Sequence, residues 1–198
     1  MLTFDGSTHT YFWDGARVPG LTDTIKPLID LSMVDPDTLE LARQKGTAIH
    51  KMAELDLADD LDVDGLPEWM APLYRGWRKF REDTGLVHWA SECKLYHPSG
   101  WACTPDIIGL LTKAPGRKAK GGAVIEIKRT FIGGPAIGVQ TAAQLEAWNR
   151  NNPDRKASQR YGLRLLPGDY RLEPWEDPDD YAVFLACLTI KRYKEKHA

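Results

Sequence analysis

Cysteine is scarce in this chain, and its spacing excludes frameworks that depend on paired thiols. Only three cysteines occur among 198 residues, at Cys93, Cys103 and Cys187, and no two of them form a C-x-x-C pair. A cluster held by four cysteine thiolates therefore lacks its ligands. We expect no iron–sulfur cluster, and we interpret the three thiols as reduced, buried side chains.

Long apolar runs are also missing. No stretch approaches the length that a membrane-spanning helix needs, and the N-terminus lacks the basic-then-apolar pattern of a signal peptide. These absences predict a cytoplasmic protein without a membrane partner.

The chain has no excess of positive charge. Its formal net charge is −2 at pH 7, which is unusual for a protein that binds nucleic acid over a broad surface. Any contact with DNA must therefore come from local basic patches and from acids that a metal ion neutralises. The sequence also lacks a Walker A loop, so any activity driven by ATP would need a partner protein that binds the nucleotide.

The patterns that are present predict one α/β domain over residues 1–198, because the length suits a single substantial core. Asp14-Gly15 between apolar–polar alternations indicates a hairpin with a two-residue turn. The predicted segments are an N-terminal hairpin at 1–24, helices at 35–84, a central core at 86–150, and a C-terminal hairpin and helix at 157–198.

Within these segments the periodicity predicts three continuous strands and three amphipathic helices. The acidic stretch 56–64 is interpreted as a solvated loop, because it lacks the ligand pattern of a calcium loop. The strands are Leu86–His97, Trp101–Thr112 and Gly122–Thr130. The expected inward residues are Leu39, Ala42, Gly46, Ile49 and Ala53 in the first helix, Trp69, Leu73, Trp77 and Phe80 in the second, and Tyr181, Phe184, Leu185 and Leu188 in the last.

Two charges interrupt the strand Gly122–Thr130. Val124, Ile125 and Ile127 suit a buried strand, yet Glu126 and Lys128 stand two residues apart and so point to one face. Burying such a pair costs several kcal/mol unless each charge has partners. One interpretation is a structural ion pair at a sheet edge, and the other is a metal site.

A second strand offers another carboxylate. Trp101–Leu111 is an apolar run with one acid, Asp106, which follows Pro105. If the two strands are neighbours, Asp106 and Glu126 lie around one divalent cation with Lys128 beside them. Hard carboxylate oxygens suit Mg²⁺ or Mn²⁺.

This set, P-D followed by E-x-K, resembles the PD-(D/E)XK nuclease superfamily. Further motifs are similar to its RecB-like branch of phage and prophage exonucleases: KGTAIH ending at His50, the acid Glu92, and the helix segment QTAAQLEAW. In that segment either Gln140 or Gln144 matches the glutamine of the branch, and the tyrosine of its motif is missing. The motif residues in chain order are His50, Glu92, Asp106, Glu126, Lys128 and Gln140 or Gln144.

The resemblance implies a restriction-endonuclease-like core, a central mixed sheet flanked by helices, preceded here by the N-terminal hairpin. It also implies Mg²⁺ or Mn²⁺ held by His50, Asp106, Glu126 and the carbonyl of Ile127, with Glu92 in support. Lys128 would orient a water or stabilise developing negative charge, and the motif glutamine would bind Lys128 or the scissile phosphate.

Basic residues between and after the two strands are the candidates for binding DNA. The segment Lys113–Gly121 is either a solvated loop or a basic finger that contacts phosphates. The candidates are Lys113, Arg117, Lys118, Lys120 and Arg129.

The expected function is hydrolysis of DNA phosphodiesters, by an exonuclease that acts on free ends of single or double strands in recombination or repair. A recombination or annealing protein is an expected partner, in a bacterial or phage-infected cell. The alternatives are a site- or structure-specific endonuclease, and a non-catalytic nucleic-acid-binding module that retains the fold. The motifs leave polarity, and DNA versus RNA, open.

Overall fold

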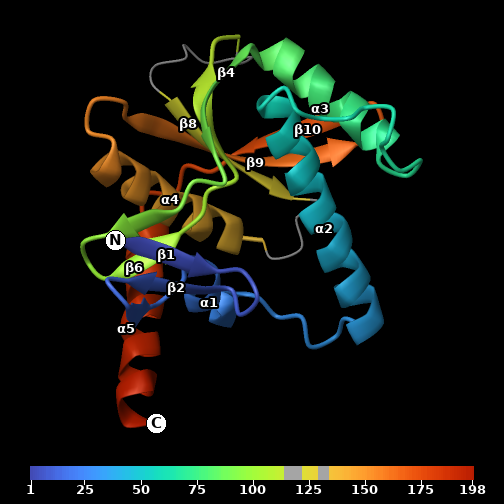
Figure 1. The fold of residues 1–198 in the computed structure, drawn as a ribbon. Helices are drawn as coiled ribbons and strands as arrows, with labels where there is room; N and C mark the ends of the chain where they lie inside the picture. The colour runs from blue at the N-terminus through green and yellow to red at the C-terminus, as the bar shows by residue number, and fades with distance from the viewer. Residues whose placement is uncertain (114–121, 129–133) are drawn as a thin grey trace.

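A five-stranded mixed sheet forms the centre of the protein (Figure 1). The computed structural model describes residues 1–113, 122–128 and 134–198. The sheet has the order β10-β9-β8-β7-β4, in which only β8 and β9 are parallel neighbours. Its strands are β4 (Leu86–Ser91), β7 (Ile107–Leu111), β8 (Gly122–Lys128), β9 (Ala157–Leu166) and β10 (Asp169–Pro174).

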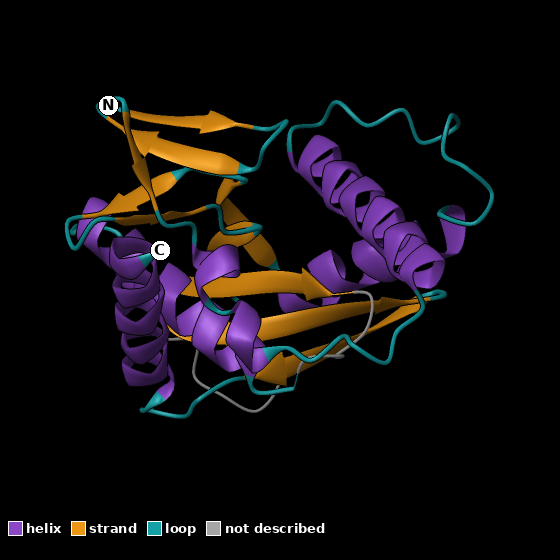
Figure 2. Cartoon of the chain, turned by 90° about the horizontal axis from the view of Figure 1, so that it is seen from below, coloured by secondary structure: helices purple, strands orange, loops and turns teal. Residues whose placement is uncertain are grey.

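Helices cover both faces of this sheet (Figure 2). One face packs against α2 (Pro36–Leu57) and α3 (Ala71–Thr84), and the other against α4 (Ala136–Asn151), α5 (Asp180–His197) and the short α1 (Leu21–Thr24). A 3₁₀ turn, η1 (Lys26–Leu28), follows α1. The predicted fold class is thereby confirmed. Among the described helices, none combines the length and apolarity that a membrane crossing requires.

Strand β8 lies in the middle of the sheet and is buried along almost its whole length. Its side chains alternate between the layers: Ile125 and Ile127 pack on the α2–α3 face, and Val124 packs on the α4–α5 face. With a period of two, Glu126 and Lys128 share the face of Val124 and point toward α4. The prediction that both charges lie on one face is confirmed, but the strand is central and not an edge.

The N-terminal segment forms a separate antiparallel sheet of β1 (Leu2–Asp5), β2 (Thr10–Trp13) and β3 (Ala16–Val18). The turn between β2 and β3 is Asp14-Gly15, and both residues have positive φ, 48° and 80°. That backbone is the two-residue hairpin turn which Asp-Gly favours. The predicted hairpin is confirmed, with β1 as an additional strand. The predicted C-terminal hairpin is β9–β10, turning at Pro167-Gly168.

Two predicted strands are wrong in one respect, because each breaks into two. Leu86–His97 divides into β4 and β5 (Leu95–His97), and Trp101–Thr112 divides into β6 (Trp101–Cys103) and β7. Strands β5 and β6 pair with each other in a small sheet outside the central one. The breaks fall at Glu92, whose φ is 47°, and at Pro105, which has no backbone N–H for a ladder. Asp106 therefore stands where the chain enters the central sheet.

Several side chains predicted to point inward are exposed. In α2, Ile49, Met52 and Ala53 are buried, whereas Leu39 is 39% exposed. Only the second half of α2 packs on the sheet. The helical spacing of apolar residues in its first half therefore does not indicate that they are buried. Helix α3 starts at Ala71, which leaves Trp69 partly exposed, and Leu185 of α5 points outward while Phe184 and Leu188 are buried.

The prediction that residues 56–64 form a solvated loop is wrong at its first two residues, because α2 extends to Leu57. Asp56 lies in α2 and is buried. Its carboxylate accepts hydrogen bonds from the Trp77 indole, at 2.6 Å, and the Tyr74 hydroxyl, at 2.9 Å, and it pairs with Arg81. These donors offset the desolvation of the carboxylate, so Asp56 joins α2 to α3.

Candidate functional site

Glu126 lies at the centre of a buried polar cluster between β8 and α4. Its Oε1 accepts hydrogen bonds from Lys128 Nζ, at 2.8 Å, and Gln140 Nε2, at 2.6 Å, and its Oε2 accepts one from Gln144 Nε2, at 2.7 Å. Gln140 and Gln144 are four residues apart and so lie on one face of the helix. Both candidate glutamines contact the carboxylate, so either can serve as the motif glutamine.

Asp106 is held by the backbone of the E-x-K strand. The amide N–H of Ile127 donates to Asp106 Oδ2 at 2.7 Å, and the Asp106 side chain is 7% exposed. The carbonyl oxygen of Ile127 faces His50 Nε2 at 3.1 Å. The central peptide group of the motif therefore fixes both Asp106 and His50.

His50 reaches this point from α2. It follows Ile49, which is buried against the sheet, and its ring projects from the edge of that buried stripe. In the neutral ring, which metal binding requires, donation from Nε2 to the Ile127 carbonyl leaves the lone pair on Nδ1, the nitrogen that faces the acids. A ring nitrogen held in this way is the usual arrangement of a metal-binding histidine.

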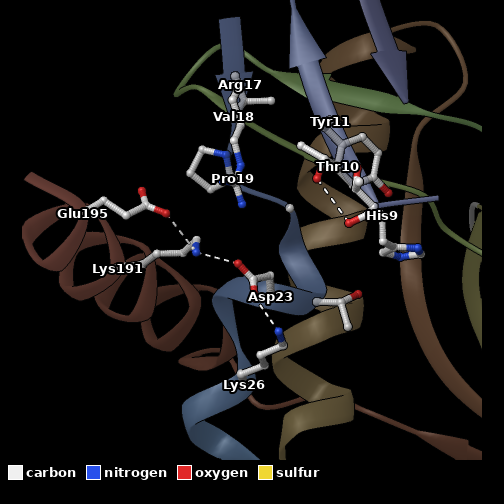
Figure 3. Close-up of a pocket in the computed structure, with 13 residues that line it drawn as sticks. His9, Thr10, Tyr11, Arg17, Val18, Pro19, Asp23, Lys26, Lys191 and Glu195 are labelled. Atoms are coloured by element: carbon white, nitrogen blue, oxygen red, sulfur yellow. Dashed lines mark hydrogen bonds and ion pairs between the residues drawn. The ribbon is translucent and has the colours of Figure 1, made fainter. Parts of the chain in front are cut away.

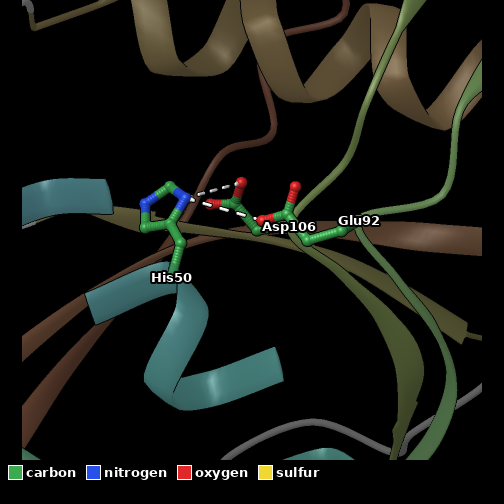
Figure 4. A group of neighbouring side chains, drawn as sticks. All are labelled: His50, Glu92 and Asp106. Carbon is green, nitrogen blue, oxygen red and sulfur yellow. Dashed lines mark ion pairs between the residues drawn. The ribbon is translucent and has the colours of Figure 1, made fainter. Parts of the chain in front are cut away.

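Three side chains form a group of suitable geometry for a metal ion (Figure 4). His50 Nδ1 is 3.3 Å from Asp106 Oδ1 and 3.7 Å from Glu92 Oε1, and one ligand atom of each residue lies within 4.8 Å of the others. With metal–ligand bonds of about 2.1 Å, adjacent ligands of an octahedral ion lie about 3 Å apart. The two observed histidine–carboxylate separations are only slightly wider than this spacing.

Glu92 is oriented by a strained backbone. Its φ of 47° is uncommon for a residue other than glycine, and its N–H donates to the carbonyl of Asp106 at 3.2 Å. Such strain persists only where the surrounding structure fixes it, and it is frequent at functional sites. The sequence places Glu92 in a supporting role, and the structure places it in the metal-compatible group.

The charges of this site shift two pKa values strongly. Burial alone would lower the pKa of His50, but the nearby carboxylates of Asp106, Glu92 and Glu126 outweigh it and raise the pKa to about 9. Burial raises the pKa of Asp106, the charge of Glu126 raises it further, and together they bring it to about 7 although His50 and Lys128 oppose them. The site therefore attracts a positive charge.

Glu126 and Lys128 remain an ion pair. Burial raises the pKa of Glu126, but the charge and hydrogen bond of Lys128, with the Gln144 amide, bring it below its ordinary value. Burial lowers the pKa of Lys128, and the charges of Glu126 and Asp106 raise it above its ordinary value. Lys128 is thus charged at neutral pH while 30% of its side chain is exposed.

The metal ligands implied by the resemblance are only partly the ones in this group. His50 and Asp106 belong to it, whereas Glu126 has both oxygens engaged by Lys128 and the glutamines. A carboxylate has about four lone-pair sites, so three donors leave Glu126 one further acceptor position. Metal binding by Glu126 and by the Ile127 carbonyl stays a prediction.

Of the predicted DNA-binding residues, Lys113 alone falls within the part of the chain that the structure describes. Arg117, Lys118, Lys120 and Arg129 lie outside the described residues. Lys113 follows the far end of β7, seven residues from Asp106, which is about 23 Å along an extended chain. Its contact with DNA stays a prediction, and that contact would lie away from the acids.

Sequence reasoning missed Tyr11 and Thr104. The Tyr11 hydroxyl and Thr104 Oγ1 are 2.7 Å apart, and Thr104 directly precedes Pro105-Asp106. Burial raises the pKa of Tyr11 to about 12 despite the Thr104 hydrogen bond, with smaller contributions from Glu92 and Glu126. The two residues are 93 positions apart, so no local pattern could reveal the contact.

Fold and site together define a mixed α/β protein in which buried acids and glutamines lie at the central sheet beside a partly exposed lysine and histidine. The sequence matches no protein-family model, and a search of curated proteins found no significant match.

Proposed function

We propose that this protein is a metal-dependent nuclease that hydrolyses phosphodiester bonds in DNA. One observation carries the proposal: Asp106, directly before β7, meets Glu126 and Lys128 of the neighbouring strand β8 at one place with His50. An ordinary ion pair in a sheet needs neither the second buried acid nor the histidine. The resemblance to PD-(D/E)XK nucleases of the RecB-like branch supports the same chemistry.

The residues that would hold the cation are His50, Glu92 and Asp106. Two carboxylates and one imidazole suit Mn²⁺. They also suit Mg²⁺, although Mg²⁺ has less preference for the imidazole nitrogen. When bound, the ion would polarise a phosphoryl oxygen and lower the pKa of a water molecule. The raised pKa values of His50 and Asp106 fit a site that is incomplete without a cation.

Lys128 supplies the fixed positive charge of the proposed reaction. Its ammonium group is anchored by Glu126 Oε1 at 2.8 Å and retains partial exposure. A preorganised cation in a water-poor site stabilises negative charge as it develops on the phosphoryl oxygens. Gln140 and Gln144 hold Glu126 from α4, so they position Lys128 indirectly.

We further propose that the enzyme requires a DNA end. The described residues form no second domain that could read bases in a groove, and a nuclease without sequence readout needs another restriction. A free end is the simplest one. A recombination or annealing protein as partner stays a prediction.

Digestion of labelled linear, nicked and closed circular DNA with Mn²⁺ or Mg²⁺ tests both statements. We expect linear DNA to be degraded from its ends and closed circles to survive, with no cleavage in EDTA or by Asp106→Asn. Rapid cutting of closed circles into discrete bands would replace the exonuclease by an endonuclease. Absence of cleavage on every substrate, with a folded protein, would refute the nuclease proposal.

A further inference from the structure

A cavity of about 510 Å³ lies between the N-terminal sheet, α1 and α5 (Figure 3). Its walls come from β2 and β3, from the segment Pro19–Lys26, and from two residues of α5. The volume falls within the range of about 300–1,000 Å³ that is typical of ligand sites. It has room for a short stretch of one nucleic acid strand and too little for a double helix.

Basic side chains outnumber acidic ones around this cavity. Lys191 pairs with Asp23, at 2.5 Å, and with Glu195, at 3.0 Å, and Lys26 pairs with Asp23 at 2.7 Å. Arg17 is exposed, and its guanidinium group has no hydrogen bond or ion pair among the described residues. The cavity therefore carries an excess of positive charge, and the guanidinium group of Arg17 is free to bind a ligand.

The other polar groups at the wall suit a phosphodiester. Thr22 brings an exposed hydroxyl, and His9 an exposed imidazole, to the same cavity. A guanidinium group binds phosphate through two parallel N–H donors, and threonine and histidine side chains add single donors. An acidic peptide would also be attracted by Arg17. The cavity is linked to the group His50, Glu92 and Asp106, called the acidic cluster from here on, and this link favours a nucleic acid strand.

That link runs through the wall of the cavity. Tyr11 lines it, and the Tyr11 hydroxyl bonds to Thr104, two residues before Asp106. The carbonyl of Pro19, another wall residue, accepts the N–H of Ala102 at 3.0 Å. The cavity is thus built on β6, the strand that continues directly toward Asp106.

We propose that this cavity binds the sugar–phosphate backbone of a single DNA strand that extends from the acidic cluster, with Arg17 as its phosphate ligand. The proposal rests on the nuclease function proposed above and adds how the strand is held. The formal net charge of the chain is −2, so attraction to DNA depends on local charges such as the free guanidinium group of Arg17.

The test compares Arg17→Ala with Arg75→Ala, a matched control. Arg75 is an exposed arginine of α3, on the other side of the central sheet, and among the described residues it has no ion pair. Binding of a fluorescein-labelled single-stranded 20-mer is measured by anisotropy in EDTA, which prevents cleavage, over a range of salt concentrations. Melting temperatures confirm that both variants fold.

We expect Arg17→Ala to weaken binding about tenfold, because a hydrogen-bonded charge contact contributes about 1.5 kcal/mol or more. The slope of log K against log salt should decrease by about 0.7 in magnitude, the value for one phosphate contact on a single strand. Arg75→Ala should change neither quantity. In Mn²⁺, Arg17→Ala should raise KM for linear DNA and leave kcat near that of wild type.

Equal affinity and equal salt slope for the two variants would overturn the proposal. So would the loss of binding to a poly-glutamate peptide in Arg17→Ala with unchanged binding of the 20-mer, which would identify a peptide site. If wild type cleaves DNA and Arg17→Ala binds normally, only the cavity assignment fails. If wild type cleaves nothing while Arg17→Ala still loses the 20-mer, the nuclease proposal fails and strand binding stands.

Discussion

Asp106→Asn should stabilise the metal-free protein and remove its response to metal. The substitution keeps the shape of the side chain, and the asparagine Oδ1 can still accept the Ile127 N–H. It removes a carboxylate that is buried beside Glu126. The two effects have opposite signs, so a merely structural role for Asp106 cannot produce both.

The size of the first effect follows from the pKa of Asp106. Well below pH 3.8 the carboxyl is protonated in both the folded and the unfolded states, so folding buries no charge there. Between its ordinary pKa of 3.8 and its folded pKa of about 7, the unfolded state loses its proton first, so stability falls as the pH rises. Three pKa units correspond to about 4 kcal/mol. The gain in Asp106→Asn is smaller, because His50 loses a partner.

The second effect follows from ligand linkage. Mn²⁺ at 100 times its Kd stabilises a folded protein by about 2.7 kcal/mol. For a chain of this length, 1 kcal/mol shifts Tm by about 2–4 °C, so wild type should gain about 5–11 °C. Asp106→Asn should gain almost nothing.

Thermal melts at pH 5 and pH 8, in EDTA and in Mn²⁺, measure both effects. Asp64→Asn is the control, because Asp64 is exposed and, among the described residues, unpaired. The reasoning is refuted if Asp106→Asn is less stable than wild type in EDTA at pH 8, or if it keeps the wild-type shift in Mn²⁺.

Two further substitutions test how the buried charges divide between chemistry and stability. Lys128→Ala should reduce DNA cleavage at least about 100-fold, the effect of removing one preorganised donor, while the shift of Tm in Mn²⁺ persists; unfolding of the variant with unchanged activity per folded molecule would make Lys128 a structural ion-pair partner. Arg160→Ala should lower the free energy of unfolding by about 3–5 kcal/mol in urea, because it leaves Asp180 buried without the Arg160 contact at 2.8 Å. Arg171→Ala, which breaks an exposed pair with Glu173, should lower it by less than about 1 kcal/mol, and an equal loss in both variants would contradict the assignment.

The alternation in β8 was sufficient to predict the central feature of the site. A strand has only two faces, so the separation of Glu126 and Lys128 by two residues determines that they lie together. Which partners they meet depends on helix α4, whose Gln140 and Gln144 are spaced by one turn and therefore could be predicted to share a face.

The break between β6 and β7 could not be predicted with equal security. Trp101, Ile107 and Leu111 are all apolar, and hydrophobicity alone does not reveal that the first faces a different layer from the other two. Glu92 is a similar case, because its positive φ depends on contacts that the whole fold imposes. The cavity beside Tyr11 depends on residues from both ends of the chain, and no local pattern encodes it.

The route of the chain through β6 limits how far this protein can be shortened. Asp106 is reached only after β6, and β6 is bonded along its edge to the segment ending in Gly20. A fragment starting at Asp35 would keep every residue of the acidic cluster, and it would lose both the Pro19 and the Tyr11 contacts that brace the approach to Asp106. The N-terminal sheet contributes no residue to the group His50, Glu92 and Asp106, yet the smallest fragment that keeps this group in place should include it.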